Sequence, residues 1–267
     1  MATHSGETAL ITGASSGIGK ELTRLFARDG YDIVLVARGK SQLEALAAEL
    51  RQRHGVSVTV LAKDLAQPGA AQAVYDELTR AGTTVDVLVN NAGYATYGSF
   101  TEIPAETELA MLQVNMAALT HLCKLFLPPM VRRGSGRVLN VASTAAFQPG
   151  PLMAAYYASK AYVLSLSEAL ANELHGTGVT VTALCPGPTR SGFQSRAKME
   201  DSKLVQGNIM AAAPVARAGY RALQAGKTVE IPGLRNRLLV QAGRFTPRKT
   251  LTGIVRRMQE RVQERVR

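Results

Sequence analysis

The sequence has few cysteines and histidines, the side chains that most often build disulfides and metal sites. Cys123 and Cys185 are the two cysteines, and the four histidines are scattered along the chain. Because these residues do not have the spacing of metal ligands, we expect no metal site. Two cysteines without a pairing pattern also indicate a reducing compartment. We therefore expect a cytoplasmic protein.

The sequence also lacks segments typical of secretion signals and membrane spans. Its N-terminus has no basic region followed by an apolar run, and Glu7 interrupts it. The stretch from Val138 to Ser159 carries no charge, but Asn140 and the helix breakers at 149–151 make it a poor membrane span. These absences predict a soluble protein.

No internal repeat or low-complexity linker divides the 267 residues, of which 46% are hydrophobic. Apolar runs alternate with helical patterns, which is typical of a parallel sheet covered by helices on both faces. The seven predicted strands are Thr8–Ile11, Val34–Val36, Val56–Leu61, Val85–Val89, Val138–Val141, Val179–Leu184 and Val229–Ile231. Helices are predicted at about 40–54, 68–82, 115–133 and 153–175. We expect one α/β domain over residues 1–231 and a helical extension over 232–267.

A glycine-rich turn follows the first predicted strand. It reads Gly13-Ala14-Ser15-Ser16-Gly17-Ile18-Gly19. A helical pattern with apolar Leu22, Leu25 and Phe26 comes directly after it. Glycines let the backbone turn tightly and approach a pyrophosphate, while the free amides and the positive helix end attract its charge. Strand, glycine turn and helix in this order predict a dinucleotide site.

Tyr156 and Lys160 stand four residues apart in an Ala-rich helical pattern, so they would share one helical face. A phenol with a pKa of about 10 is a poor acid or base at neutral pH. We expect Lys160 to lower the Tyr156 pKa by charge proximity, which suits general acid and base catalysis. Ser143 could hydrogen-bond the same carbonyl oxygen, whereas the adjacent Tyr157 has the wrong phase. By itself such a pair is more often a surface contact, and the dinucleotide site favours the catalytic interpretation.

In combination, these motifs resemble the classical short-chain dehydrogenase/reductase family over about residues 8–231. The turn from Thr12 to Gly19 is similar to the coenzyme turn of that family. Four residues match its catalytic tetrad: Asn115, Ser143, Tyr156 and Lys160. The resemblance implies a Rossmann fold, hydride transfer between NAD(P) and CH–OH or C=O groups, and homodimers or homotetramers. It also implies that Lys160 holds the nicotinamide ribose and that Asn115 anchors a water for proton replacement.

The same resemblance implies further cofactor contacts. Asp64 and Leu65 match the adenine contact, and Pro186 and Gly187 with Thr189 match the segment that lies against the nicotinamide carboxamide. One more motif matches the element that steadies the central sheet, and its last three residues are expected beside the cofactor: Asn90, Asn91, Ala92 and Gly93.

The end of the second strand determines the choice between NAD and NADP. Ala37 stands where an acidic residue would be needed to hold a ribose diol, and Arg38 follows it. A cation at this place can pair with the extra phosphate of NADP. By resemblance, Ser15 in the glycine turn faces the same phosphate. We therefore expect NADP(H) rather than NAD, unless Arg38 is a solvated residue that opens the next helix.

Apolar and aromatic side chains near the predicted catalytic residues suggest a lipophilic substrate. The segment 190–220 lies where the family carries its mobile substrate loop. Five residues are predicted to line the substrate pocket: Tyr94, Tyr97, Phe147, Met153 and Phe193. With few polar groups to orient a ligand, this pocket predicts a lipophilic carbonyl compound or alcohol. Each of these side chains could instead belong to the core.

Positive charge is concentrated at the C-terminus of a chain whose formal net charge is +11. The range Arg235–Arg267 holds ten basic and two acidic residues. Its apolar residues recur at helical spacing: Leu251, Ile254, Val255, Met258 and Val262. A basic amphipathic helix most often packs on its own protein or on a sister subunit. Attachment to a membrane surface is the second interpretation, and nucleic-acid binding is not expected because no reading module accompanies the charge.

The sequence therefore predicts an NADP(H)-dependent oxidoreductase in which Tyr156 donates a proton and Ser143 polarises a lipophilic carbonyl. One alternative is a reductase of 3-oxoacyl groups on a carrier protein or CoA, because an acidic carrier would suit a basic surface. The other is a non-catalytic NADP-sensing or interaction protein on the same fold.

Overall fold

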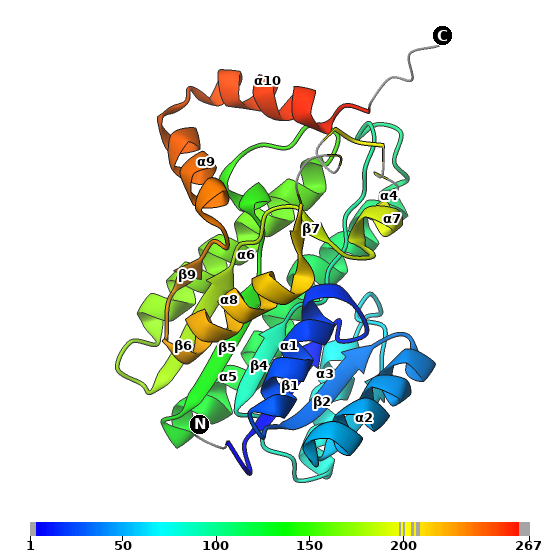
Figure 1. Ribbon diagram of the computed structural model, residues 1–267, viewed down its shortest axis with the longest axis vertical. Coiled ribbons are helices and arrows are strands. Elements are labelled where there is room, and N and C mark those ends of the chain that lie inside the picture. Colours follow the sequence, from blue (N-terminus) through cyan, green and yellow to red (C-terminus); the bar gives the residue numbers. More distant parts are fainter. Residues whose placement is uncertain (1–3, 198, 200, 204–205, 207–208, 262–267) are drawn as a thin grey trace.

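A seven-stranded parallel sheet forms the centre of the protein (Figure 1). The computed structural model describes residues 4–197, 199, 201–203, 206 and 209–261. The strand order is β3-β2-β1-β4-β5-β6-β9. The strands are β1 (Thr8–Thr12), β2 (Asp32–Ala37), β3 (Val58–Ala62), β4 (Val87–Asn90), β5 (Gly136–Val141), β6 (Val179–Leu184) and β9 (Val229–Glu230). The predicted α/β class with seven parallel strands is confirmed.

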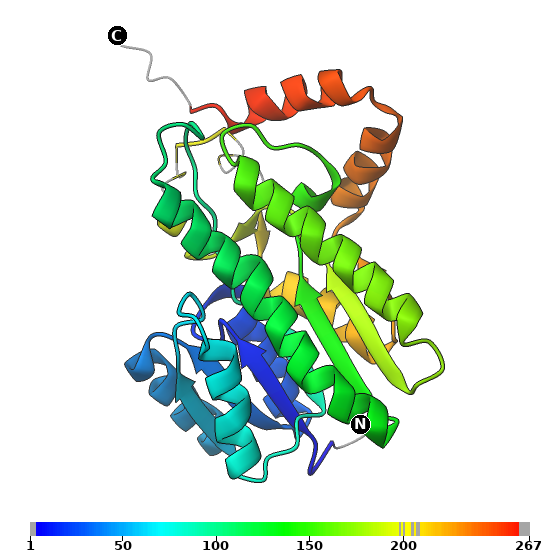
Figure 2. The ribbon, with the colours of Figure 1, turned by 180° about the vertical axis from the view of Figure 1, so that it is seen from behind.

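Helices cover both faces of the sheet because alternate strand residues point to opposite sides. In β1, Leu10 packs into the core beneath one helical layer, whereas Ala9 and Ile11 pack into the other. One layer contains α1 (Gly17–Arg28), α2 (Lys40–His54) and α8 (Ala212–Gln224). The other contains α3 (Ala70–Arg80), α5 (Leu119–Arg133) and α6 (Ala154–Glu173), seen from behind in Figure 2. Both sheet faces are thereby removed from water.

The strand order reverses between β1 and β4, so two crossover connections leave the sheet in opposite directions at this point. In open α/β sheets, ligands bind at the carboxyl ends of the strands beside such a reversal. Asn90 of β4 donates to Asn140 of β5 at 2.9 Å, and Asn140 donates to Ser167 of α6 at 3.0 Å. This buried chain of hydrogen bonds links the two central strands to the helix that carries Tyr156.

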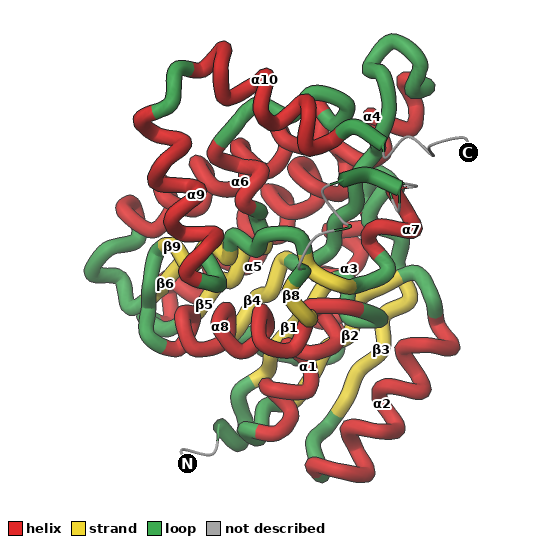
Figure 3. The backbone as a smooth tube through the Cα atoms, turned by 45° about the horizontal axis from the view of Figure 1, so that its top comes forward, coloured by secondary structure: helices red, strands yellow, loops and turns green. Residues whose placement is uncertain are grey.

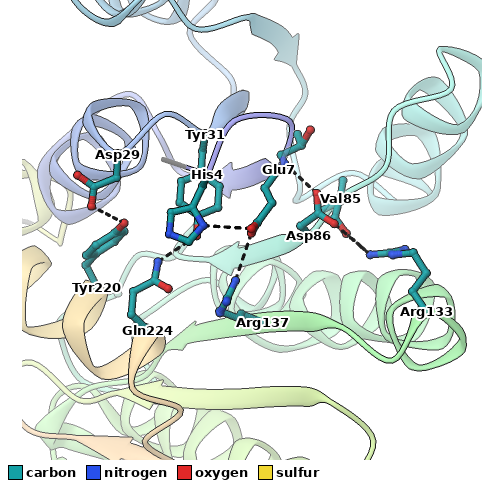
Figure 4. A network of polar contacts seen from close by, with 11 residues as sticks. His4, Glu7, Asp29, Tyr31, Val85, Asp86, Arg133, Arg137, Tyr220 and Gln224 are labelled. Atoms are coloured by element: carbon teal, nitrogen blue, oxygen red, sulfur yellow. Dashed lines mark hydrogen bonds and ion pairs between the residues drawn. The ribbon is translucent and has the colours of Figure 1, made fainter. Parts of the chain in front are cut away.

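Polar contacts hold the opposite end of the sheet together (Figure 4). Tyr220 of α8 donates to Asp29 at 2.7 Å, which joins α8 to the end of α1. Glu7 accepts a bond from Arg137 of β5 at 3.3 Å, and Asp86 accepts one from the Thr8 amide at 2.9 Å. These contacts lie at the amino ends of the strands, away from the predicted cofactor turn.

The helix predicted at 115–133 differs from its expected start. Helix α4 (Ala105–Leu112) begins earlier than the predicted residue 115, and it continues through a π-helical turn (Gln113–Ala118) into α5. Pro104 before α4 and the acidic residues of its first turn are helix-start signals that explain the early beginning. This long apolar stack could span a membrane by length and composition, but α5 packs its apolar side into the core.

The segment expected as a substrate loop contains regular structure. Two short strands, β7 (Thr189–Arg190) and β8 (Met210–Ala211), pair in parallel outside the main sheet, and α7 (Phe193–Ala197) lies between them in sequence. From Ala212 the chain forms α8, whose apolar side packs against α1. Only the part before Ala212 can therefore act as a loop over the cleft.

The C-terminal extension, as far as residue 261, forms two helices rather than one. These are α9 (Leu234–Phe245) and α10 (Arg248–Gln259), and Pro247 stands at the boundary because a proline cannot continue the preceding helix. Figure 3 shows both helices at the end of the molecule where α6 begins. Val262, which was assigned to the predicted amphipathic helix, lies outside the described residues.

Candidate active site

The glycine turn between β1 and α1 has the geometry of an anion site. Gly13 and Gly17 have φ values of +65° and +55°, which side chains other than glycine rarely adopt. A Cβ on Gly19 would lie 2.4 Å from the Gly13 carbonyl oxygen, so this position needs glycine for close packing rather than for contact with a ligand. The N-cap residue of α1, Ser16, makes no side-chain hydrogen bond to the first helical turn. The amides there remain available to a phosphate.

The loop after β4 holds this turn in place. The Asn91 side-chain amide donates to the carbonyl oxygens of Thr12 and Gly13 at 2.9 and 3.2 Å. The backbone amides of Asn91 and Ala92 both donate to the Thr12 hydroxyl at 3.0 Å. The predicted Asn-Ala-Gly element and the glycine turn therefore form one unit, although about 80 residues separate them in sequence.

A cavity of about 810 Å³ begins at this turn and is lined by most of the predicted cofactor residues. These are Gly13, Ser15, Ser16, Gly17, Ile18, Arg38, Asp64, Leu65, Asn91, Ala92, Gly93, Tyr156, Lys160, Pro186, Gly187 and Thr189. Gly19 is the one predicted cofactor residue of the glycine turn that does not line the cavity, because it packs against the Gly13 carbonyl. Ala37, the last residue of β2, and Arg38 after it line the same wall. The end of β2 therefore presents a cation to the cleft and no carboxylate. Arg196 is a second cation of this wall, and it donates to the Ser16 hydroxyl at 3.5 Å.

The π-helical turn positions Asn115 beneath the cleft floor. The Asn115 side-chain oxygen accepts from the Tyr94 amide at 3.1 Å, and its nitrogen donates to the Tyr94 carbonyl at 2.9 Å. The same nitrogen donates to Ser159 at 3.1 Å. A Cβ added to Gly93 would lie 3.0 Å from the Asn115 side-chain oxygen and 3.4 Å from Lys160 Nζ. Asn115 is 1% exposed, so it holds the Tyr94 backbone beside Lys160 without lining the cavity itself.

Tyr156, Lys160 and Ser143 meet at the carboxyl end of β5. Tyr156 and Lys160 lie one turn apart on α6, with Lys160 Nζ 5.8 Å from the centre of the Tyr156 ring. Lys160 donates to the Val141 carbonyl at 2.8 Å. Ser143 donates to the Pro186 carbonyl at 3.3 Å and accepts from the Ala145 amide at 3.1 Å. The three side chains line one stretch of the cavity.

Burial dominates the proton affinities of this group. It raises the pKa of the Tyr156 phenol above its ordinary value, while a polar contact with Ser143 acts in the opposite direction. Burial lowers the pKa of Lys160 to about 8. The expectation that Lys160 lowers the Tyr156 pKa is therefore not met here, because the ammonium bonds to Val141 and the loss of hydration outweighs its charge. A neutral phenol at physiological pH is suited to donating a proton.

Beyond Tyr156 the cavity continues into an apolar region. Three of the predicted pocket residues, Tyr94, Met153 and Phe193, line it. The Phe193 ring lies 5.5 Å from the Tyr156 ring. The other two residues lie elsewhere: the Tyr97 hydroxyl donates to the Gln259 backbone carbonyl, and Phe147 packs against the main core. Both were predicted from closeness in sequence, which does not determine the direction of a side chain in a loop.

The two C-terminal helices form the far wall of this region. Asn236 of α9 lies so close to Gly187 that a Cβ there would be 2.7 Å from its side-chain amide. Leu251 and Val255 of α10 line the cavity and pack with Met153 and Tyr157. The first interpretation of the amphipathic segment, packing on its own protein, thus describes the inner side of α10.

Gln148 and Gln259 were not assigned to this wall from the sequence. Tyr157 accepts a bond from the Gln259 side-chain amide, and it also has a polar contact with Gln148. All three line the cavity, and the Gln259 side-chain oxygen has no hydrogen-bond partner among the described residues. A signal was present, because Gln259 continues the apolar stripe of Leu251 and Val255 at four-residue spacing. A glutamine in an apolar stripe indicates a buried polar contact.

Taken together, the sheet reversal, the glycine turn and the Tyr156 cluster define a dinucleotide-dependent oxidoreductase. Residues 7–202 match the family model described as short chain dehydrogenase. The chain belongs to the short chain dehydrogenase family and is an NAD(P)-dependent oxidoreductase. This membership argues against the non-catalytic alternative.

Three similar proteins illustrate the range of this family. A short-chain dehydrogenase from Sphingobium yanoikuyae in complex with NADPH is 37% identical, with a TM-score of 0.81 over 97% of this chain and 99% of that one. The bulky-bulky ketone specific alcohol dehydrogenase from Comamonas testosteroni is 32% identical, with a TM-score of 0.77 over 97% and 98%. Ketoacyl reductase HetN from Nostoc sp. is 29% identical over 280 residues, which cover 100% of this chain and 96% of the relative. Against other curated relatives the chain spans as little as 31% of their length.

Proposed function

We propose that this protein is an NADP(H)-dependent reductase of lipophilic ketones or aldehydes, and that it oxidises the matching alcohols when the cofactor ratio favours it. One observation carries the proposal: a single cavity runs from the glycine turn and Arg38, past Tyr156, to the apolar side chains of α9 and α10. Cofactor, proton donor and an apolar binding region therefore share one space.

The cofactor end of the cavity fits a dinucleotide with an additional phosphate. The amides that begin α1 suit the pyrophosphate, and Arg38 beside Ser15 suits a phosphate on the ribose. Ala37 offers no carboxylate that would repel this phosphate. Two of the similar solved structures, those of the Sphingobium dehydrogenase and of a sorbose reductase, contain NADPH, which supports the same choice.

The residues around Tyr156 support proton delivery to a carbonyl oxygen. When bound in this cleft, NADPH would supply the hydride that forms the new C–H bond as the carbonyl π bond breaks. The Tyr156 phenol, held neutral by burial, gives its proton to the oxygen to form the O–H bond. Ser143 donates a hydrogen bond to the same oxygen as its negative charge grows. Lys160 lies 5.8 Å from the phenol ring, and the phenolate left by this transfer regains a proton from solvent.

The shape of the substrate region supports a bulky apolar substrate. Met153, Phe193, Leu251 and Val255 surround it from three segments of the chain. Apolar surface of this extent stabilises a hydrocarbon body by about 25 cal/mol for each Å² removed from water. The similarity to an enzyme specific for bulky-bulky ketones agrees with this substrate class.

A 3-oxoacyl thioester is the second candidate substrate. The likeness to a ketoacyl reductase over the whole chain favours it, and the net charge of +11 would attract an acidic carrier protein. Both candidates require the same chemistry at Tyr156, so they differ only in the group bound between α6 and the C-terminal helices.

Loss of NADPH absorbance distinguishes the candidates. We would supply bulky ketones, 3-oxoacyl-CoA and carrier-bound 3-oxoacyl groups in parallel at equal concentration. The proposal predicts turnover with bulky ketones and little with either thioester. Turnover confined to a thioester would select the second candidate, and no turnover with any carbonyl compound would contradict both.

A further inference from the structure

Helix α9 has two apolar sides. Leu239 and Val240 face the substrate cleft and line it. Leu234, Leu238 and Phe245 are spaced by four and seven residues and therefore share another side of the helix. Their exposed fractions are 73%, 61% and 88%. Three large apolar side chains exposed on one helical side indicate an interaction surface.

Uncompensated positive charge surrounds these side chains. The range Leu234–Gln259 contains seven lysines and arginines and no aspartate or glutamate. Arg235, Arg244, Arg248 and Lys249 are exposed, and none of them forms an ion pair with an acidic residue that the structure describes. Apolar side chains flanked by arginine and lysine are typical of helices that lie in the plane of a membrane surface.

We propose that the outer side of α9, defined by Leu234, Leu238 and Phe245 with its neighbouring cations, binds the surface of an anionic lipid bilayer. The apolar side chains would enter the boundary between head groups and acyl chains, and the cations would contact lipid phosphates. A second copy of the chain suits this surface poorly. A twofold interface would bring the same cations of both copies together, and like charges repel.

The opening of the substrate cleft lies on the same two helices as this surface. Leu239, Ile254 and Met258 line the cavity and are also 57%, 46% and 41% exposed, so they form an apolar rim on the same pair of helices. A lipophilic ketone dissolved in the bilayer could pass over this rim to Tyr156 without entering water. This step rests on the proposed function, whereas bilayer binding itself does not.

Co-sedimentation of the full chain with vesicles tests the binding. We would compare vesicles of phosphatidylcholine alone with vesicles that also contain phosphatidylglycerol. Binding should require the anionic lipid and should weaken as salt is added. The double substitutions Leu238→Ser with Phe245→Ser, and Arg235→Glu with Arg244→Glu, should each weaken binding by at least about tenfold.

Matched controls carry substitutions of the same kind on α4 and the loop before it, or at the other end of the molecule. Phe100→Ser with Leu109→Ser removes side chains that are 65% and 64% exposed, but near acidic residues. Arg80→Glu with Arg132→Glu reverses two exposed charges at the ends of α3 and α5, far from α9 and α10 (Figure 2). Both controls should bind vesicles like the wild type, and NADPH binding should be unchanged in every variant because all these side chains lie outside the cleft.

Equal binding to neutral vesicles, equal loss in the controls, or no loss in the α9 variants would overturn the proposal. Oligomeric state, measured by light scattering, gives one more contradicting outcome: the α9 substitutions dissociate an oligomer, and the wild type does not bind vesicles.

Kinetics separate this proposal from the proposed function. With a ketone carried in anionic vesicles, the α9 variants should raise KM at unchanged kcat, and with a water-soluble ketone they should match the wild type. Absence of all turnover would contradict the proposed function alone, because vesicle binding is measured without a substrate.

Discussion

The cofactor half of the cleft and its substrate half are held together in different ways. In the cofactor half, backbone groups and Asn91 fix the glycine turn between the two large cores that flank the sheet. The substrate half has a small core of its own, in which Met111, Met153, Met199 and Val255 come from separate segments. Tyr156 belongs to that small core, although α6 packs its other side against the sheet.

This difference separates recognition of the cofactor from recognition of the substrate. Main-chain geometry at Gly13 and Gly17 strongly favours glycine, whereas an apolar wall accepts many side chains of similar size. Substitutions in the cofactor half should therefore change the affinity for one ligand sharply. Those in the substrate half should change which carbonyl compound is bound.

The substitution Tyr156→Phe, at the junction of the halves, should have the largest effect. Removing the proton donor should reduce kcat by about a thousandfold, while the dissociation constant of NADPH stays nearly the same. Single-turnover kinetics and NADPH fluorescence measure the two quantities. Tyr157→Phe is the matched control, because its hydroxyl bonds to Gln259 rather than facing Ser143. Equal losses in both variants would remove Tyr156 from its assigned role.

The buried ammonium of Lys160 should make stability depend on pH. Its pKa is lowered from 10.5 to about 8, so between these values the unfolded chain binds a proton that the folded chain has released. Lys160 therefore makes a contribution to stability that grows as pH rises from about 8 to 10.5, by on the order of 3 kcal/mol. Urea unfolding of the wild type and of Lys160→Met should show this contribution as a difference between the two proteins that changes over this pH range. Parallel pH profiles for the two proteins would contradict the assigned burial.

Arg38→Ala should separate the two nicotinamide cofactors. Loss of a charge-assisted contact to the extra phosphate should weaken NADPH binding by about 2 kcal/mol and leave NADH binding unchanged. Isothermal titration measures both affinities. Lys40→Ala is the control, because this exposed neighbour does not line the cavity. A similar loss for NADH would mean that Arg38 contacts a part common to both cofactors.

Phe193→Ala should affect the substrate half alone. The ring lies against Tyr156, and its removal should raise KM for a bulky ketone by about tenfold through lost apolar contact. The affinity for NADPH should not change. Phe100→Ala, at an exposed position away from the cleft, should leave both quantities as they are. An unchanged KM in the Phe193 variant would exclude this ring from the substrate region.

Tyr97→Phe should have the smallest effect. The structure places its hydroxyl on the Gln259 backbone carbonyl, so the substitution removes one hydrogen bond between α10 and the loop after β4. The free energy of unfolding should fall by about 1 kcal/mol, with KM unchanged. A large rise in KM with unchanged stability would support the position predicted from sequence, inside the pocket.

These two halves also differ in how far the sequence predicts them. The strand, glycine turn and helix at residues 8–28 are local patterns, and Tyr156 and Lys160 stand one helical turn apart, so spacing alone indicates their arrangement. The parallel sheet follows from the alternation of strands and helices. For these reasons the fold class and the cofactor cleft could be predicted.

The substrate wall could not be predicted in the same way, because it depends on contacts between distant segments. Tyr97 and Gln259 are separated by 162 positions, and Tyr157 and Gln259 by 102. The amphipathic pattern at 251–258 predicts a helix but does not say which surface the helix covers. The direction of the Tyr156 pKa shift also depends on burial, which the four-residue spacing to Lys160 does not reveal.

Isotope transfer from NADPH tests the central claim most directly. The enzyme would be supplied with NADPH deuterated at the transferable position and with a bulky ketone, and the product alcohol would be analysed by mass spectrometry and NMR. Direct hydride transfer predicts deuterium on the carbinol carbon of one enantiomer. An alcohol without deuterium, or no alcohol from any ketone despite measurable NADPH binding, would contradict it.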